Sequence, residues 1–177
     1  MRSLVKALAI TAAAAGLFVP GSVFGHGNEP GESSATIGGG KVTVKYVAPS
    51  ARGRDVMSLI QPGSYWRMGA DKATTLTSEV DLMFGDTKVP KGEYTLVAHF
   101  IGERKWELVA AESVTTPGWQ PQGMVASVPA KLDKLDTPVE HMTIKLEGHG
   151  SKGKLTLQWG TSQPTAEFSA SSGLASR

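Results

Sequence analysis

The chain has 177 residues, 18 of them basic and 16 acidic, and it contains no cysteine. A chain of this length suits one domain with its own hydrophobic core, and the lack of cysteine excludes disulfides and a lipid anchor on cysteine. Arg2 and Lys6 lie in a stretch that we expect to be removed, which leaves 16 basic residues against 16 acidic ones. This balance argues against a nucleic-acid partner.

The first 25 residues have the features of a secretory signal peptide. A basic start that includes Arg2 precedes the apolar run 7–19, which is too short to span a bilayer. Val23 and Gly25 supply the small residues that precede a cleavage site. We expect cleavage after Gly25 and a periplasmic or secreted protein with no membrane anchor.

Apolar and polar residues alternate along several stretches between residues 36 and 169. The alternating apolar positions include Val42, Val44 and Tyr46 in one stretch and Leu76, Val80, Leu82 and Phe84 in another. A period of two is typical of half-buried β-strands. The polar segments 26–35 and 170–177 lack this period, and we expect both to be flexible.

Two pairs of apolar runs predict β-hairpins. Residues 89–112 hold two runs joined around Gly102, and residues 141–160 hold two runs joined by the glycine-rich turn 148–153. Only residues 54–60 suggest a short helical turn. The prediction is therefore an all-β, single-domain fold over residues 36–169, either an antiparallel β-sandwich or a partly closed barrel.

Residues 52–76, RGRDVMSLIQPGSYWRMGADKATTL, carry a distinctive pattern: a Gly-Arg pair, a Pro-Gly turn and then WRMGADKATT. This pattern resembles the bacterial exported family of domain of unknown function 2911. PKGEYTL at 90–96, WEL at 106–108 and LTLQWG at 155–160 agree with it. The resemblance implies an exported β-rich domain and carries over no catalytic residue. Asp71 stands where asparagine is commoner in the family.

Arg67 leads the candidate binding residues. In a strand, Tyr65 and Arg67 share one face while Trp66 takes the other, so the tryptophan is expected in the core. Arg67, Tyr65 and Asp71 could form a small polar pocket in which the guanidinium recognises a carboxylate, a phosphate or a sugar hydroxyl.

Arg67 can instead have a structural role. An ion pair with Asp71, Glu79 or Asp81 would hold the turn that follows the arginine, and we favour this interpretation. Glu79 and Asp81 lie two positions apart on one expected strand face. We interpret them as solvated side chains rather than a catalytic pair of carboxylates.

Trp119 lies in the proline-rich segment TTPGWQPQG. An aromatic ring there can stack on a sugar or a peptide proline, or it can cap the end of the sandwich, and we favour capping. Trp119 and the loop from Arg67 to Lys72 form the expected contact surface. Its partner would be a small molecule, a glycan or an envelope protein.

The histidines allow a metal-binding alternative. His99 lies within the apolar run YTLVAHFI and is predicted to be buried, while His141 is predicted to be exposed. Cleavage after Gly25 would make His26 the first residue, so that its amine and imidazole could bind copper, with His99 or His141 completing the site.

Nucleophilic catalysis has little support, because there is no cysteine and no Gly-x-Ser-x-Gly motif. The sequence favours an exported cell-envelope protein that acts as a non-catalytic binding or structural module without a cofactor. The alternative is a copper-binding protein or metalloenzyme that uses His26.

Overall fold

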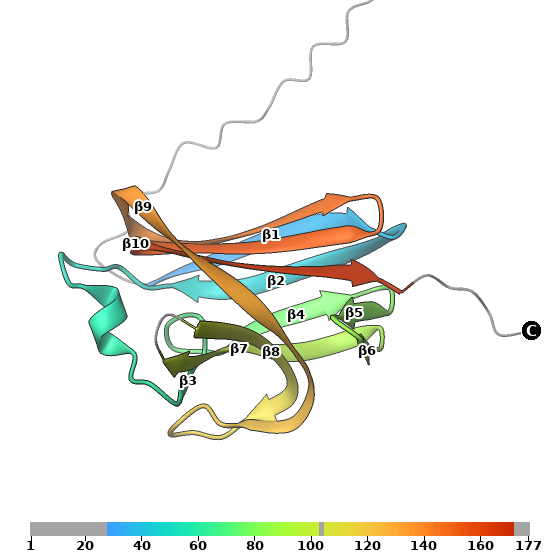
Figure 1. Ribbon diagram of the computed structural model, residues 1–177, viewed down its shortest axis with the longest axis horizontal. Helices are drawn as coiled ribbons and strands as arrows, with labels where there is room; N and C mark the ends of the chain where they lie inside the picture. The colour runs from blue at the N-terminus through green and yellow to red at the C-terminus, as the bar shows by residue number, and fades with distance from the viewer. Residues whose placement is uncertain (1–27, 103–104, 172–177) are drawn as a thin grey trace, which may run out of the picture.

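The computed structural model describes residues 28–102 and 105–171 (Figure 1). The expected signal peptide and His26 lie outside these residues. The described elements, in chain order, are β1 (Glu29–Ile37), β2 (Gly40–Ala48), the 3-10 helix η1 (Val56–Leu59), β3 (Ser64–Trp66), β4 (Thr74–Ser78), β5 (Leu82–Phe84), β6 (Thr87–Val89), β7 (Gly92–Gly102), β8 (Lys105–Val114), β9 (Pro121–His149) and β10 (Lys152–Ala170).

The strands form one antiparallel sheet that folds into two layers. Its hydrogen-bonded order is β1-β2-β4-β7-β8-β9-β10-β5-β6, and β3 pairs with β7 beyond the end of β4. One layer contains β1, β2 and the hairpin of β9 and β10, and the other contains β3, β4, β7 and β8 (Figure 1). The sheet stays open at β1 and β6, so the predicted all-β antiparallel sandwich is confirmed and the sheet does not close into a barrel.

Both predicted hairpins are present. β7 and β8 pair from Thr95 to Gly102, and β9 and β10 pair outward from the turn after His149. The predicted helical turn is the 3-10 helix η1.

β9 takes part in both layers. Its first part pairs with β8 and its last part pairs with the first half of β10 (Figure 1). β10 bends where its pairing with β9 shifts register on both sides of Gly160, which has a φ of 57°. Only glycine adopts this backbone without strain, and a side chain there would also meet Val56.

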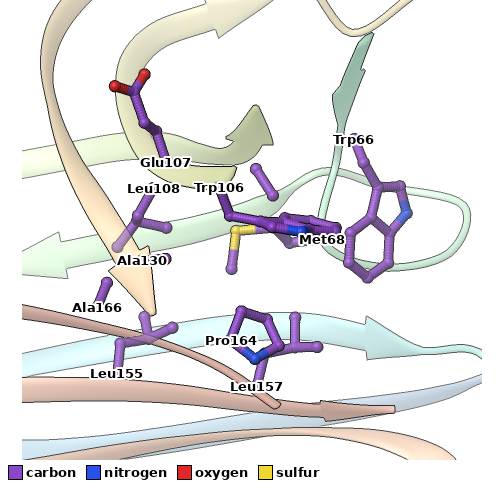
Figure 2. Close-up of a pocket in the computed structure, with 11 residues that line it drawn as sticks. Trp66, Met68, Trp106, Glu107, Leu108, Ala130, Leu155, Leu157, Pro164 and Ala166 are labelled. Carbon is purple, nitrogen blue, oxygen red and sulfur yellow. The ribbon is translucent and has the colours of Figure 1, made fainter. Parts of the chain in front are cut away.

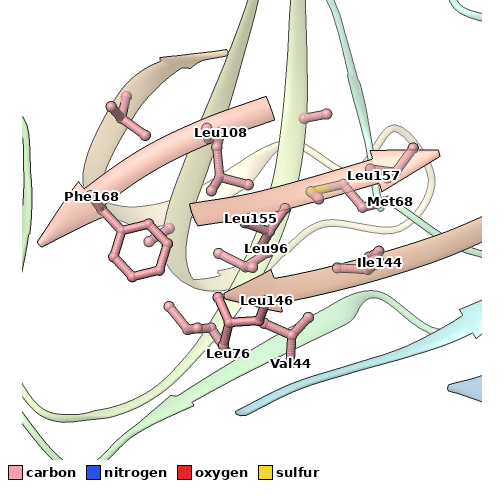
Figure 3. Packing of buried hydrophobic residues seen from close by; sticks show 14 of the residues in the cluster. Val44, Met68, Leu76, Leu96, Leu108, Ile144, Leu146, Leu155, Leu157 and Phe168 are labelled. Carbon is pink, nitrogen blue, oxygen red and sulfur yellow. The ribbon is translucent and has the colours of Figure 1, made fainter. Parts of the chain in front are cut away.

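The core lies between the layers and is built from the inward positions of the alternating strands. Figure 3 shows leucines of β4, β7, β8, β9 and β10 meeting there. Leu146 pairs with Leu155 and Ile144 with Leu157, and all four side chains are buried. The alternation predicted for β2 is confirmed, with Val42 and Val44 fully buried.

Two stretches differ from the prediction. Residues 29–35, expected to be flexible and outside the domain, belong to β1, because the backbone of β2 pairs with every residue from Glu29 to Ile37. The alternating stretch 76–84 is two strands rather than one. It breaks after Ser78, whose hydroxyl donates a hydrogen bond to the Val80 carbonyl at 2.6 Å and so bends the chain.

β1 also lies against β9, within the layer to which both belong. The backbone N–H of Leu146 donates to the Ser33 hydroxyl at 2.9 Å, and the N–H of Gly38 donates to the Gly150 carbonyl at 2.8 Å. A Cβ at Gly148 would collide with the Thr36 carbonyl oxygen, so the close approach requires glycine. In the described part of the chain, no helix is long and apolar enough to cross a membrane.

Candidate functional site

A row of polar side chains crosses the outer face of β3, β7 and β8. Trp66, Ala98 and Leu108 point into the core, so the residues that alternate with them face outward. Tyr65 is in register with His99, and His99 with Glu107. Facing residues on neighbouring antiparallel strands have Cβ atoms about 5 Å apart, so the pairing fixes this row before any side-chain contact forms.

The three side chains are in contact. The rings of Tyr65 and His99 stack with centroids 4.3 Å apart and planes 11° apart. The Nδ1 atom of His99 lies 3.6 Å from Oε2 of Glu107, and their side chains are 23% and 31% exposed. The prediction that His99 is buried is therefore wrong, because its side chain faces outward and only the Tyr65 ring stacks on it.

Arg67 and Trp119 form a second pair. The guanidinium carbon of Arg67 lies 4.4 Å from the centroid of the Trp119 ring, within the range of a cation–π interaction. Its Nε donates a hydrogen bond to the Gly69 carbonyl at 3.0 Å. Arg67 comes directly after β3, two positions after Tyr65. We call Tyr65, Arg67, His99, Glu107 and Trp119 the outer-face cluster.

The ion pairs expected for Arg67 are not formed. Among the described residues, no carboxylate lies within ion-pair distance of its guanidinium. Instead, the arginine holds its turn through the Gly69 carbonyl, and its own carbonyl accepts the N–H of Thr74 at 3.0 Å. The structural role is retained, but with different partners.

Asp81 binds two lysines. Lys88 Nζ lies 2.7 Å from its carboxylate, and the backbone N–H of Lys91 donates to it at 2.9 Å. The hydrogen bond from the Lys88 side chain has the larger effect and that from the Lys91 backbone the smaller, and both lower the pKa of Asp81 below its usual value. Glu79 is exposed and accepts the backbone N–H of Lys41 at 2.8 Å. The two carboxylates therefore have separate structural partners.

The loop that carries Trp119 folds back on itself. The backbone N–H of Trp119 donates to the Thr115 carbonyl at 3.1 Å, and the backbone N–H of Thr115 donates to the Gln120 carbonyl at 2.9 Å. Trp119 has a φ of 55°, which costs a residue with a side chain about 1 kcal/mol. The loop thus positions the indole against Arg67 from a distant part of the sequence.

Asp71 and Lys72 are outside this cluster. Both are exposed in the turn after Arg67, and Asp71 accepts a hydrogen bond from Asn28 Nδ2 at 3.1 Å. The structure therefore brings together three of the five predicted binding residues. Glu107 was not predicted, although the register of the hairpin around Gly102 could have placed it opposite His99.

The predicted metal ligands are only partly placed. His141 is exposed, as predicted, and His26 lies outside the described residues. Within the described ranges, no group of three His, Cys, Asp or Glu side chains is arranged to hold a metal ion. His99 has one carboxylate neighbour, Glu107.

The fold and the cluster together define a β-sandwich protein with a polar and aromatic patch on one outer face. Residues 29–168 match the family described as "Protein of unknown function (DUF2911)", so the chain belongs to this family. No curated protein and no solved structure matches the chain.

Proposed function

We propose that the protein is an exported, non-catalytic binding module of the cell envelope that recognises an acidic small molecule or an acidic glycan at the outer-face cluster. The basic, apolar and small residues of the first 25 positions support export. Binding is supported by the way Arg67 is held.

The Arg67 guanidinium is fixed while one of its edges stays unused. Nε is bound to Gly69, and Trp119 covers one side of the guanidinium group. In the described part of the chain, its two terminal nitrogens form no hydrogen bond to a protein acceptor. Such an edge donates two parallel hydrogen bonds to a carboxylate or a phosphate, and a guanidinium that is already ordered loses less entropy on binding.

The neighbouring pair adds a ring surface and a charge. Tyr65, two positions before Arg67, stacks on the ring of His99, and aromatic rings of this kind offer a surface on which a sugar ring can pack. The Glu107 carboxylate, at the β8 end of the row of Tyr65, His99 and Glu107, repels an acidic group on a ligand. It therefore favours ligands whose acidic group lies toward Arg67.

Calorimetric titration with matched probes tests the binding proposal. We expect galacturonate and glucuronate to bind more tightly than galactose and glucose. The substitutions Arg67→Ala and Trp119→Ala should remove this preference. Lys41→Ala, which removes an exposed cation on β2, should leave it unchanged. No binding of either acid, or a preference that survives Arg67→Ala, would overturn the proposal.

Export is tested separately. Protein recovered from the periplasm or the medium should begin at His26 by intact mass measurement. A chain that remains in the cytoplasm with residues 1–25 attached would refute export and leave the binding result standing. Adding copper to the processed protein, and to the same protein extended by one residue, tests the alternative that depends on His26.

A further inference from the structure

A small pocket opens between the two layers, on the opposite side of β3 and β8 from the outer-face cluster. Its lining includes Trp66, Met68, Trp106, Leu157, Pro164 and Ala166 (Figure 2). The cavity volume is about 20 Å³, and its walls are almost wholly apolar.

One of the lining residues, Trp106, carries a buried polar atom without a partner. Trp106 is 3% exposed, and its Nε1 has no hydrogen-bond partner. Buried donors in native proteins are nearly always paired, so an unpaired donor on a residue that lines a pocket indicates a missing acceptor. Trp159 Nε1 is also unpaired, but Trp159 does not line the pocket.

Water is a poor occupant for this pocket. The volume is enough for about one water molecule, but a buried water needs two to four polar partners. Beyond the Trp106 N–H, the lining offers almost no polar surface. An apolar molecule with one acceptor matches both the walls and the single donor.

The pocket can be reached from solvent. Trp66, Ala130 and Pro164 are only half-buried and form its outer part. Glu107 contributes to the lining, but its carboxylate points away from the pocket in Figure 2, toward its contact with His99. The entrance is therefore uncharged. Met68 is buried in the wall, and its unbranched side chain can adjust to a larger guest.

We propose that this pocket binds the end of a small, mainly apolar molecule, and that a single acceptor oxygen on this molecule, of the ketone or ester type, accepts the hydrogen bond of Trp106 Nε1. The volume limits the inserted part to about one heavy atom, the acceptor oxygen, and the remainder of the molecule lies at the half-buried rim. Of the outer-face cluster, only Glu107 also lines this pocket, and the proposed hydrogen bond uses no residue of the cluster.

A pair of probes with the same shape tests the proposal. 2-Butanone carries a carbonyl where 2-methyl-1-butene carries a methylene group, so only the ketone can accept the indole proton. We expect saturable quenching or shift of tryptophan fluorescence with both probes and about fivefold tighter binding of the ketone, the effect of one hydrogen bond. In ¹⁵N-labelled protein, the indole N–H resonance of Trp106 should move downfield with the ketone alone.

Matched variants distinguish the contribution of the Trp106 donor to binding from that of the cavity. Trp106→Phe should abolish the preference for the ketone, whereas Trp159→Phe, which removes the other unpaired buried N–H, should preserve it. Ala130→Leu, which fills the half-buried rim, should weaken the binding of both probes. The labelled native protein gives a readout even if a variant does not fold. No saturable binding of either probe, or an unmoved Trp106 resonance in the presence of ketone, would overturn the proposal.

Discussion

The Arg67 guanidinium lies over the Trp119 ring at 4.4 Å while its Nε donates to Gly69 in the same turn. One side chain thus ties the end of β3 to the loop between β8 and β9. Replacing it removes a cation–π contact and a hydrogen bond at once.

We therefore expect Arg67→Ala to lower the free energy of unfolding by about 1–2 kcal/mol. Arg67→Lys keeps the charge but loses the planar stack and the Nε hydrogen bond, so we expect it to lower the free energy of unfolding by about half as much. Urea denaturation measures both. Unchanged stability in both variants, together with loss of acid binding, would make Arg67 a binding residue with no structural role.

Glu147 should make stability depend on pH in the acid range. Hydrogen bonds from Lys145 and Lys154 lower the pKa of its carboxyl from 4.5 to about 2. A carboxyl whose pKa is lower in the folded state stabilises the protein above its ordinary pKa, and this contribution is lost as the pH falls from 4.5 toward 2. Between these values, the stability of the native protein should fall more steeply with pH than that of Glu147→Gln. A carboxyl NMR titration with its midpoint near 4.5 would contradict the assignment.

Glycine at position 148 should be essential for the contact between β1 and β9. A Cβ there would meet a backbone carbonyl oxygen, that of Thr36, which cannot rotate away as a side chain could. We expect Gly148→Ala to destabilise the protein by about 1–3 kcal/mol. The exposed neighbour provides a control, since His149→Ala should change stability by less than about 0.5 kcal/mol.

The core between the layers should respond to truncation as a packed interior. Leu157 is 3% exposed and sits among the buried leucines of Figure 3, so Leu157→Ala should cost about 2–5 kcal/mol. Ile101, 46% exposed at the end of β7, is the contrasting position. If Ile101→Ala cost as much as Leu157→Ala in thermal melts, the arrangement of the two layers would be wrong.

The hairpin of β9 and β10 was predictable because its pattern is local. Met142, Ile144 and Leu146 alternate on one side of a glycine-rich turn, with Leu155 and Leu157 on the other, and burial of these residues permits only one register. The full length of β9 could not be predicted. Residues 131–140 are mostly polar or half-buried, and residues 131–134 and Val139 pair only because β10 bends back alongside them.

The candidate site also has a part that could be predicted from the sequence and a part that could not. Strand register alone makes neighbours of Tyr65, His99 and Glu107. The sequence of the hairpin around Gly102 was enough to predict that Glu107 faces His99. The contact between Arg67 and Trp119 could not be predicted, because it depends on the path of an irregular loop. Residue type alone suggested a carboxylate partner for Arg67, whereas the folded chain provides a carbonyl and an indole.

The contact between Ser33 and Leu146 joins residues 113 positions apart. Closing so long a loop costs entropy before any packing compensates for it, and folds rich in such distant contacts fold slowly. In the described part of the chain, β9 and β10 come after every other strand, so β1 cannot be covered until both have been made. A chain that stops before β9 would leave β1 uncovered and would lack a large part of the core between the layers.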